Sequence, residues 1–175
     1  MASILVVYGT TDGQTLKICE RLRAIVEGDG HQVTLVPIEA AGDTDPSSFD
    51  KVVVGASIRY GKHSPLILAF ANRHASVLDT RPNAFFTVNI VARKPEKNRP
   101  ETNPYLQKFL RRISWRPKEL EVFAGKLDYP RYRFLDRLMI RFIMLITDGP
   151  TDPSTVIEYT DWGQVEAFAH RIARM

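Results

Sequence analysis

The sequence predicts an α/β fold in which helices cover both faces of a mostly parallel sheet. Short apolar, β-branched runs alternate along the 175-residue chain with segments of helical spacing, and this alternation is typical of parallel sheets. A hydrophobic share of 44% and a charged share of 25% fit a globular protein with one core. Because neither an internal repeat nor a long linker divides the chain, we expect a single domain over residues 1–175.

Three apolar runs predict strands in the first third of the chain, at Ser3–Tyr8, His31–Pro37 and Lys51–Ser57. Between the first two, apolar residues recur every three or four positions, so a helix is expected over Gln14–Glu27. Ala40–Asp50 is rich in Asp, Ser, Gly and Pro, which indicates a loop.

The remaining elements follow the same alternation. Ser64 and Pro65 are a good N-cap and first helical residue for a helix reaching about Leu78. Strands are expected at Asn83–Asn89 and Leu120–Ala124. Further helices are expected at Pro104–Ile113, Tyr132–Ile146 and Trp162–Ala173.

The basic residues are concentrated in one segment. The chain carries a net charge of +4, yet the stretch from Arg93 to Arg141 alone holds 14 Lys or Arg against 6 Asp or Glu. The rest of the chain is therefore acidic, and the segment implies an anionic partner such as nucleic acid, a lipid surface or an acidic small molecule.

Metal and disulfide chemistry are not expected. The single cysteine, Cys19, falls within the first predicted helix, where we expect a buried thiol. His31, His74 and His170 lack metal-ligand spacing and are interpreted as structural. With no signal peptide and no apolar stretch of about 20 residues, the sequence favours the cytoplasmic side.

The loop after the first strand has the character of a phosphate site. It reads Thr10-Thr11-Asp12-Gly13-Gln14-Thr15 and leads into a helix, whose first N–H groups and dipole favour an anion. Neither a Walker loop nor a Gly-x-Gly-x-x-Gly fingerprint is present, and a lysine-free, Thr-rich loop suits a terminal monophosphate such as that of FMN. The alternative is that Thr11 or Asp12 merely caps the helix. If the loop does bind a phosphate, Asp12 could cap the helix while pointing away from it.

The phosphate loop resembles that of flavodoxins, Thr-x-Thr-Gly-x-Thr, with Asp12 in place of the middle Thr. The wider sequence is similar to one flavodoxin-like family, the quinone-linked protoporphyrinogen oxidases of bacterial haem synthesis. The stretches that carry this resemblance are Gly9–Thr15, Val54–Gly61, Val88–Lys97, Phe109–Pro117, Tyr129–Arg133 and Tyr159–Trp162. Gly9 and Thr11 depart from it, since the family pattern has a hydroxyl residue and an Arg there.

This resemblance implies a five-stranded parallel sheet in the order 2-1-3-4-5, with helices on both faces. It implies FMN as the cofactor, protoporphyrinogen IX as the donor and menaquinone or ubiquinone as the acceptor. Hydride transfer from a macrocycle methylene carbon to the flavin, with loss of a pyrrole N–H proton, would occur in three rounds. The flavin does this chemistry, so no protein nucleophile is required.

The same resemblance suggests which residues bind the cofactor. The expected contacts come from three loops at the carboxyl ends of strands: Thr10, Thr11, Asp12, Gly13, Gln14 and Thr15 at the phosphate; Ser57, Ile58, Arg59, Tyr60 and Gly61 on one side of the ring; Thr87, Val88, Asn89, Ile90, Val91 and Ala92 on the other. Tyr60 is a candidate for stacking on the flavin or, alternatively, a partly buried loop tyrosine.

Arginine and lysine side chains are the expected partners of the substrate's two propionates. The candidates are Arg59, Arg93, Lys94, Arg131 and Arg133, each of which is otherwise a solvated surface charge. His63 is a weak candidate for the base that takes the pyrrole proton.

The segment of about residues 129–147 is the least flavodoxin-like part of the chain. Arg133, Arg137 and Arg141 follow i,i+4 spacing, and apolar residues cover most of the remaining helix surface. A basic face opposite a wide apolar one favours a helix lying in a membrane interface, where a quinone would be met. The expected location is therefore peripheral, on the cytoplasmic face of the inner membrane. The alternative is a core-packed helix with a wet arginine face.

Three other functions compete with this interpretation. A soluble flavodoxin-type electron carrier would use acidic surfaces around the flavin, whereas the segment that follows a flavin loop here is basic. A nucleic-acid-binding module would leave the Thr-rich loop unexplained, and no such motif is recognisable, so no nucleic-acid partner is expected. An NAD(P)H-dependent quinone reductase lacks support because no dinucleotide fingerprint is present.

Overall fold

A computed structural model describes all 175 residues of the chain. Its main sheet contains five parallel strands, in the order β2-β1-β3-β5-β6. Their bounds are β1 Ser3–Gly9, β2 Gln32–Pro37, β3 Lys51–Arg59, β5 Asn83–Asn89 and β6 Glu119–Ala124. Counted along the chain, these parallel strands have the order 2-1-3-4-5, so the predicted topology is confirmed.

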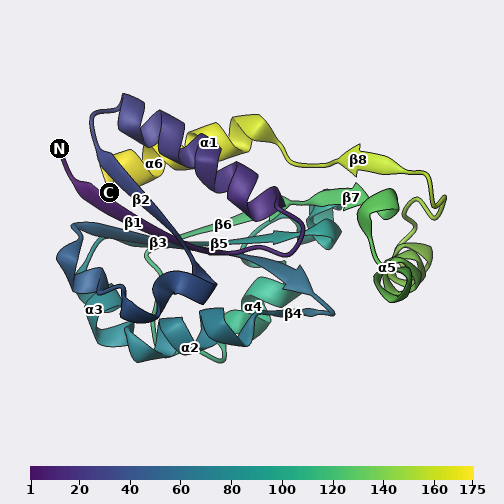
Figure 1. The fold of residues 1–175 in the computed structure, drawn as a ribbon, viewed down its shortest axis with the longest axis horizontal. Helices are drawn as coiled ribbons and strands as arrows, with labels where there is room; N and C mark the ends of the chain where they lie inside the picture. The colour runs from purple at the N-terminus through teal and green to yellow at the C-terminus, as the bar shows by residue number, and fades with distance from the viewer.

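Helices cover both faces of this sheet (Figure 1). One face is covered by α1 (Gln14–Gly28) and α6 (Trp162–Arg174), and the other by α2 (Pro65–Arg73), α3 (Ala75–Thr80) and α4 (Pro104–Leu110). Each face therefore has its own hydrophobic core, as a parallel sheet requires.

The interior strand β5, between β3 and β6, shows how tightly the two cores are packed. All seven of its residues are buried, and the neighbours Phe85 and Phe86 point into opposite cores. Phe86 packs edge to face with Phe123 and Phe168. Its ring also occupies the space beside Gly55 on β3, where a Cβ atom would overlap it. Glycine at position 55 is thus required by close packing.

Several short elements were not expected from the sequence. The helix predicted to reach Leu78 is interrupted at His74, and the predicted loop Ala40–Asp50 contains 3₁₀ turns at Ile38–Asp43 and Pro46–Ser48. Two-residue β4 (Lys62–His63) pairs antiparallel with the end of β3. Strands β7 (Lys126–Asp128) and β8 (Val156–Glu158) form a separate antiparallel ladder. Runs of two or three residues carry too little periodicity to be recognised in a sequence.

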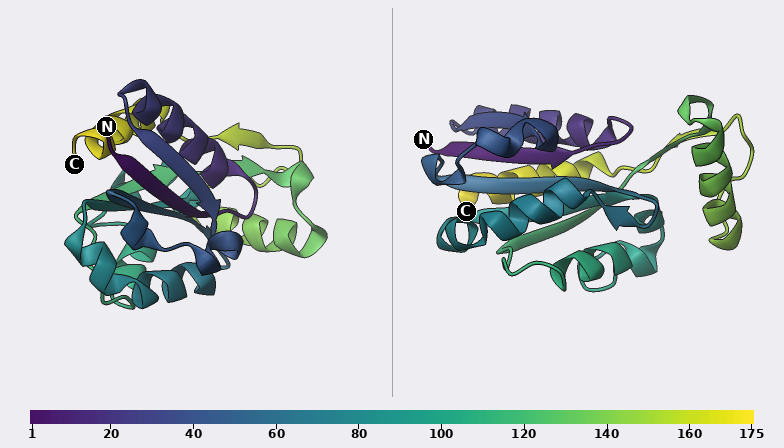
Figure 2. Two further views of the ribbon diagram at one scale, coloured as in Figure 1. Left: turned by 60° about the vertical axis from the view of Figure 1, so that its left-hand side comes forward. Right: turned by 60° about the horizontal axis from the view of Figure 1, so that its bottom comes forward.

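From β7 to β8, over residues 126–158, the chain makes a long excursion beyond the carboxyl ends of the strands. It contains the 3₁₀ turn η5 (Tyr129–Arg131) and α5 (Phe134–Ile146), which begins two residues later than the predicted helix. Figure 2 shows α5 standing apart from the sheet and its covering helices. A small buried cluster of Leu127, Tyr129, Tyr132 and Met144 holds the helix in place. None of the helices is both long enough and apolar enough to cross a membrane.

Candidate functional site

A cleft lies between the carboxyl ends of the parallel strands and α5. The loops after β1, β3 and β5 contribute three of its walls, as expected for an open parallel sheet. The fourth wall comes from the excursion, with residues of β7, η5 and α5. Tyr105 of α4 completes the lining. The predicted loops therefore meet at one site, to which the excursion adds a side that the sequence did not reveal.

The loop after β1 presents unused hydrogen-bond donors to this cleft. Gly13 precedes α1 with a φ of 89°, and its N–H donates to Thr10 Oγ1 over 3.0 Å. Thr15 is fully buried, and its hydroxyl oxygen has no hydrogen-bond partner. The first N–H groups of a helix also lack intrahelical acceptors. An acceptor-rich anion bound at this loop would satisfy them.

Asp12 does not cap α1, and neither does Thr11, because no side chain caps this helix. Asp12 lines the cleft instead. Desolvation raises the pKa of its carboxyl, while Arg59 and Arg131 act in the opposite direction. The interpretation of this residue as a helix cap is thus wrong: its carboxyl belongs to the charged groups of the cleft.

A tight turn forms the wall after β3. Tyr60 and Gly61 have φ values of 50° and 75°, and they connect β3 to β4. Two successive left-handed residues are typical of a two-residue hairpin turn whose twist matches its strands. Tyr60 lines the cleft and leaves 53% of its surface exposed.

A buried asparagine shapes the opposite wall. Asn89 Oδ1 accepts hydrogen bonds from the Ala92 N–H over 3.1 Å and from the Asn103 side-chain amide over 3.1 Å. This arrangement turns the chain away from β5, so that Ile90 and Val91 line the cleft. The side-chain amide, rather than the backbone alone, defines this loop.

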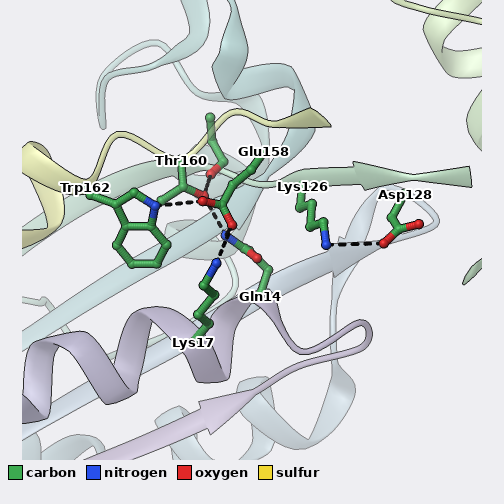
Figure 3. A network of polar contacts seen from close by, with 8 residues as sticks. Gln14, Lys17, Lys126, Asp128, Glu158, Thr160 and Trp162 are labelled. Atoms are coloured by element: carbon green, nitrogen blue, oxygen red, sulfur yellow. Dashed lines mark hydrogen bonds and ion pairs between the residues drawn. The ribbon is translucent and has the colours of Figure 1, made fainter. Parts of the chain in front are cut away.

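Asp136 of α5 connects the two sides of the cleft. Its carboxylate accepts hydrogen bonds from Arg59 and from the Tyr60 hydroxyl, both in the wall after β3. A second pair, Lys126 and Asp128, lies 3.2 Å apart on β7 (Figure 3). Both pairs place a cation beside a carboxylate within the lining of the cleft.

Glu158 of β8 ties the excursion to α1 (Figure 3). Its carboxylate accepts from Lys17 Nζ over 2.7 Å, from Gln14 Nε2 over 3.2 Å and from Trp162 Nε1 over 2.7 Å. These hydrogen bonds, with that from Lys17 the largest cause, lower the pKa of Glu158. The start of α1 is therefore fixed relative to β8.

Most residues predicted to bind a cofactor line this one cleft. They are Thr10, Thr11, Asp12, Gln14, Thr15, Ser57, Ile58, Arg59, Tyr60, Val88, Asn89, Ile90 and Val91. Gly13, Gly61, Thr87 and Ala92 do not line it. Thr87 and Ala92 are buried, and the Thr87 hydroxyl is hydrogen bonded to His63 over 2.8 Å.

The residues predicted to bind the substrate's propionates fall into two groups in the structure. Arg59 and Arg131 line the cleft, whereas Arg93, Lys94 and Arg133 do not. The Arg93 guanidinium donates to the carbonyl of Ile90 over 3.2 Å and to that of Thr147 over 2.8 Å. These hydrogen bonds connect Arg93 to the end of α5, so its guanidinium is not available to a ligand in the cleft.

The lining also contains residues that the sequence did not single out. They are Tyr105, Gly125, Lys126, Asp128, Tyr132, Asp136, Met139, Ile140 and Ile143. Seven of these belong to the excursion, residues 126–143. Its helix was predicted, but no pattern in the sequence indicated that it packs over the strand ends.

His63 lies behind the cleft rather than in it. Its ring sits against Phe109 and Phe85, with Nε2 bonded to the Thr87 hydroxyl. Burial lowers the pKa of His63 to about 4. The ring does not line the cleft, so the structure gives no support to the hypothesis that His63 is the catalytic base.

The exposed face of α5 is apolar. Its large exposed side chains are Phe134, Leu135, Leu138, Met139, Phe142, Leu145 and Ile146. Two of the three arginines face the protein: Arg137 donates to the Tyr132 carbonyl over 3.4 Å and Arg141 to the Thr151 carbonyl over 2.9 Å, whereas Arg133 is exposed. The alternative of a core-packed helix with a wet arginine face is thus wrong, because the apolar face is exposed. That the helix lies in a membrane interface stays a prediction.

Comparisons with known proteins agree with this architecture. A family model described as a flavodoxin domain matches residues 5–154. Protoporphyrinogen IX dehydrogenase [quinone] of Escherichia coli (strain K12) is 43% identical over 171 residues, which cover 98% of this chain and 94% of that protein. The protein of the same name from Leishmania major is 42% identical, over 98% of this chain and 74% of its own length.

Solved structures show the fold at lower identity. The flavodoxin of Streptococcus pneumonia TIGR4 has a TM-score of 0.55 and 12% identity, with 99% of each chain covered. Oxidised flavodoxin 1 of Bacillus cereus has a TM-score of 0.54 and 11% identity, with 98% of this chain and 97% of that chain covered. These likenesses confirm the predicted flavodoxin-like fold.

We expect His63 to make stability depend on pH. Its folded-state pKa of about 4 lies below the ordinary histidine value, so the unfolded chain binds this proton more readily between those values. The free energy of unfolding should therefore fall as the pH drops from 7 towards 4. In His63→Gln, the loss between pH 7 and pH 5 should be smaller by roughly 2 kcal/mol.

Urea denaturation of both proteins at these two pH values measures the difference. Comparing the change with pH within each protein removes any constant effect of the substitution. Identical pH dependence in wild type and His63→Gln would show that the ring is not held neutral by burial.

Proposed function

The chain belongs to the flavodoxin-domain family, among the quinone-linked protoporphyrinogen IX dehydrogenases, and we infer that it is an FMN-dependent oxidoreductase. It oxidises protoporphyrinogen IX to protoporphyrin IX, a step of haem biosynthesis, with a quinone as electron acceptor. The observation that carries this conclusion is the identity of 43% across 98% of the chain, combined with a cleft at the carboxyl ends of the strands.

The residues of the cleft fit FMN. Thr15 offers a buried hydroxyl without a partner, and the loop from Thr10 leads into the start of α1. These groups would hold the phosphate, with the loops at Tyr60 and Asn89 on the two sides of the ring. FMN supplies the redox chemistry when bound.

The polypeptide itself binds, orients and shields the reactants. The Asp136 contacts to Arg59 and Tyr60 keep the wall after β3 close to α5. On the same face of α5, one and two turns further along the helix, Ile140 and Ile143 add apolar surface to the cleft. An apolar macrocycle fits such a wall, and the enclosure limits access of water to the reacting atoms.

We further propose that α5 binds the membrane surface. Its outward face carries seven large apolar side chains, among them Phe134, Leu135 and Leu145 with exposed fractions of 70%, 74% and 67%. An apolar stripe of this size on a surface helix is typical of interfacial binding or of a protein interface. We favour the membrane because Met139 belongs both to this face and to the lining of the cleft. A quinone dissolved in lipid would thus reach the cleft along α5.

This orientation leads to a proposed location. We propose that the chain is a peripheral protein on the cytoplasmic face of the inner membrane, with menaquinone or ubiquinone as its acceptor. The buried, unpaired thiol of Cys19 is in keeping with a reducing compartment.

Anaerobic turnover tests the proposed reaction. The FMN-loaded protein, given protoporphyrinogen IX and a quinone analogue, should form fluorescent porphyrin at a rate that depends on the quinone. Protein without quinone, and quinone without protein, are the controls. If no porphyrin forms above these controls although FMN is bound, the chain does not have this activity.

Thr15→Val tests whether the orphaned hydroxyl binds FMN. Valine has nearly the same shape, and the hydroxyl has no partner within the chain. We expect the FMN dissociation constant to rise about tenfold, which corresponds to one lost hydrogen bond. The unfolding free energy of the FMN-free protein should stay constant or increase. Quenching of flavin fluorescence and urea denaturation measure the two quantities.

The matched control for this variant is Thr34→Val, since Thr34 is an exposed residue of β2. The control should leave FMN affinity unchanged. A Thr15→Val protein that binds FMN as tightly as wild type would exclude this hydroxyl from the cofactor site.

The double variant Leu135→Ser, Phe142→Ser tests membrane binding by α5. Both side chains are exposed, so thermal stability should change little, whereas binding to lipid vesicles should weaken at least tenfold. Turnover with a long-chain quinone in vesicles should fall, and turnover with a water-soluble quinone should be retained.

Leu66→Ser is the control, because Leu66 is an exposed leucine on α2, away from α5. Vesicle sedimentation and the two turnover assays provide the measurements. Unaltered vesicle binding by the double variant would refute the membrane role of this face.

A further inference from the structure

A second cavity of about 120 Å³ lies behind the Tyr60–Gly61 turn. Residues of the β4 hairpin, of α4 and of the turn after α4 line it, including Gly61, Lys62, His63, Tyr105, Lys108 and Arg112. It is separate from the cleft, yet the two share one wall, since Tyr105 lines both. Tyr60 borders the cleft and the adjacent Gly61 borders the cavity, so the turn itself divides them.

The cavity is lined by uncompensated positive charge. Lys62, Lys108 and Arg112 contribute three cations, and no Asp or Glu lines the cavity. None of the three forms a salt bridge or donates a side-chain hydrogen bond within the chain. Like charges gathered in a cleft raise the local concentration of anions. All three side chains are exposed, but they converge on one cavity that no carboxylate lines, and this convergence favours an anionic group there.

Neutral donors accompany the cations. The hydroxyl of Tyr105 makes no hydrogen bond within the chain, and desolvation raises its pKa, so it remains a donor at neutral pH. The ring of His63 forms the inner wall and is neutral because of its burial. Phe109 and Leu68 provide the apolar remainder. This combination of lysine, arginine and a phenol suits a carboxylate on a short aliphatic arm.

The cleft, by contrast, has no spare positive charge. Its three cations, Arg59, Lys126 and Arg131, are matched by three carboxylates. Arg59 is paired with Asp136 and Lys126 with Asp128, which leaves Arg131 to offset Asp12. A bound flavin phosphate would add further negative charge. A dianionic substrate in this cleft therefore needs cations from outside its lining.

We propose that Lys62, Lys108, Arg112 and the Tyr105 hydroxyl bind a propionate carboxylate of the tetrapyrrole substrate, with the macrocycle in the adjoining cleft. This assignment rests on the proposed function, and it replaces Arg93, Lys94 and Arg133 as partners of the substrate's acidic side chains. It also gives a role to Lys108 of α4 and to Arg112, which follows this helix, within the basic segment of the sequence.

The double variant Lys108→Gln, Arg112→Gln tests the assignment by binding alone. The FMN-loaded protein is titrated with protoporphyrin IX and, separately, with its dimethyl ester, which lacks the two negative charges. Wild type should bind the diacid more tightly than the ester. The variant should bind the diacid at least about tenfold more weakly and the ester unchanged, because two charge-assisted contacts are lost.

The control is Arg99→Gln, Arg111→Gln, which removes the same charge from exposed residues that line neither cavity. FMN affinity and melting temperature, measured for every variant, show whether the proteins are folded. Lys62→Gln is a second, independent test from the opposite wall of the cavity. In turnover, the KM for protoporphyrinogen IX should rise in the cavity variants while kcat is retained.

The outcomes of these experiments separate the propionate site from the proposed function. Unchanged preference for the diacid in the cavity variants, or an equal loss in the control, would overturn the propionate site and leave the proposed function intact. A wild-type protein that neither binds nor oxidises the tetrapyrrole would refute both. If the cavity variants instead lose binding to phosphatidylglycerol vesicles but keep the preference for the diacid, the cavity binds a lipid phosphate and the proposal is wrong.

Discussion

The structure depends on one constraint: a parallel sheet must be buried on both faces. Each connection between parallel strands has to cross one face of the sheet, and every loop that follows a strand then lies at the same edge. Here the loops after β1, β3 and β5 meet at that edge and form the cleft. The excursion containing α5 leaves the sheet at the same edge, after β6. Its position over the cleft is therefore a consequence of where it is inserted.

This constraint explains how much of the site could be predicted from sequence. The apolar runs that became β1, β3 and β5 locate three loops, and parallel pairing brings them together without further information. Most residues of these loops, which begin near Thr10, Ser57 and Val88, accordingly line one cleft. The parts that escaped prediction depend on contacts between distant segments. Asp136 is 77 residues from Arg59 along the chain, and no local pattern indicates that the two meet.

The direction of α5 is a second example. The sequence predicts that α5 is an amphipathic helix, and the arginine face of such a helix is ordinarily turned to water. In the structure Arg137 and Arg141 instead donate to backbone carbonyls beneath the helix. Carbonyl groups at turns need donors, and the long arginine side chain reaches them from a helix that stands away from the core. Because this demand arises from the tertiary arrangement, the helical pattern alone could not show that Arg137 and Arg141 are turned toward the protein.

The tight turn at Tyr60 and the placement of α5 depend on each other. A non-glycine residue in the left-handed region costs about 1–2 kcal/mol, and Tyr60 has a φ of 50°. A hydrogen bond to a charged group contributes about 1.5–3 kcal/mol, so the bond from its hydroxyl to Asp136 offsets this strain. The Asp136 side chain in turn is only 14% exposed, and it needs both Arg59 and Tyr60 to compensate for lost hydration. The contacts of Asp136 therefore stabilise both the turn and the start of α5. The turn is also the wall between the cleft and the cationic cavity.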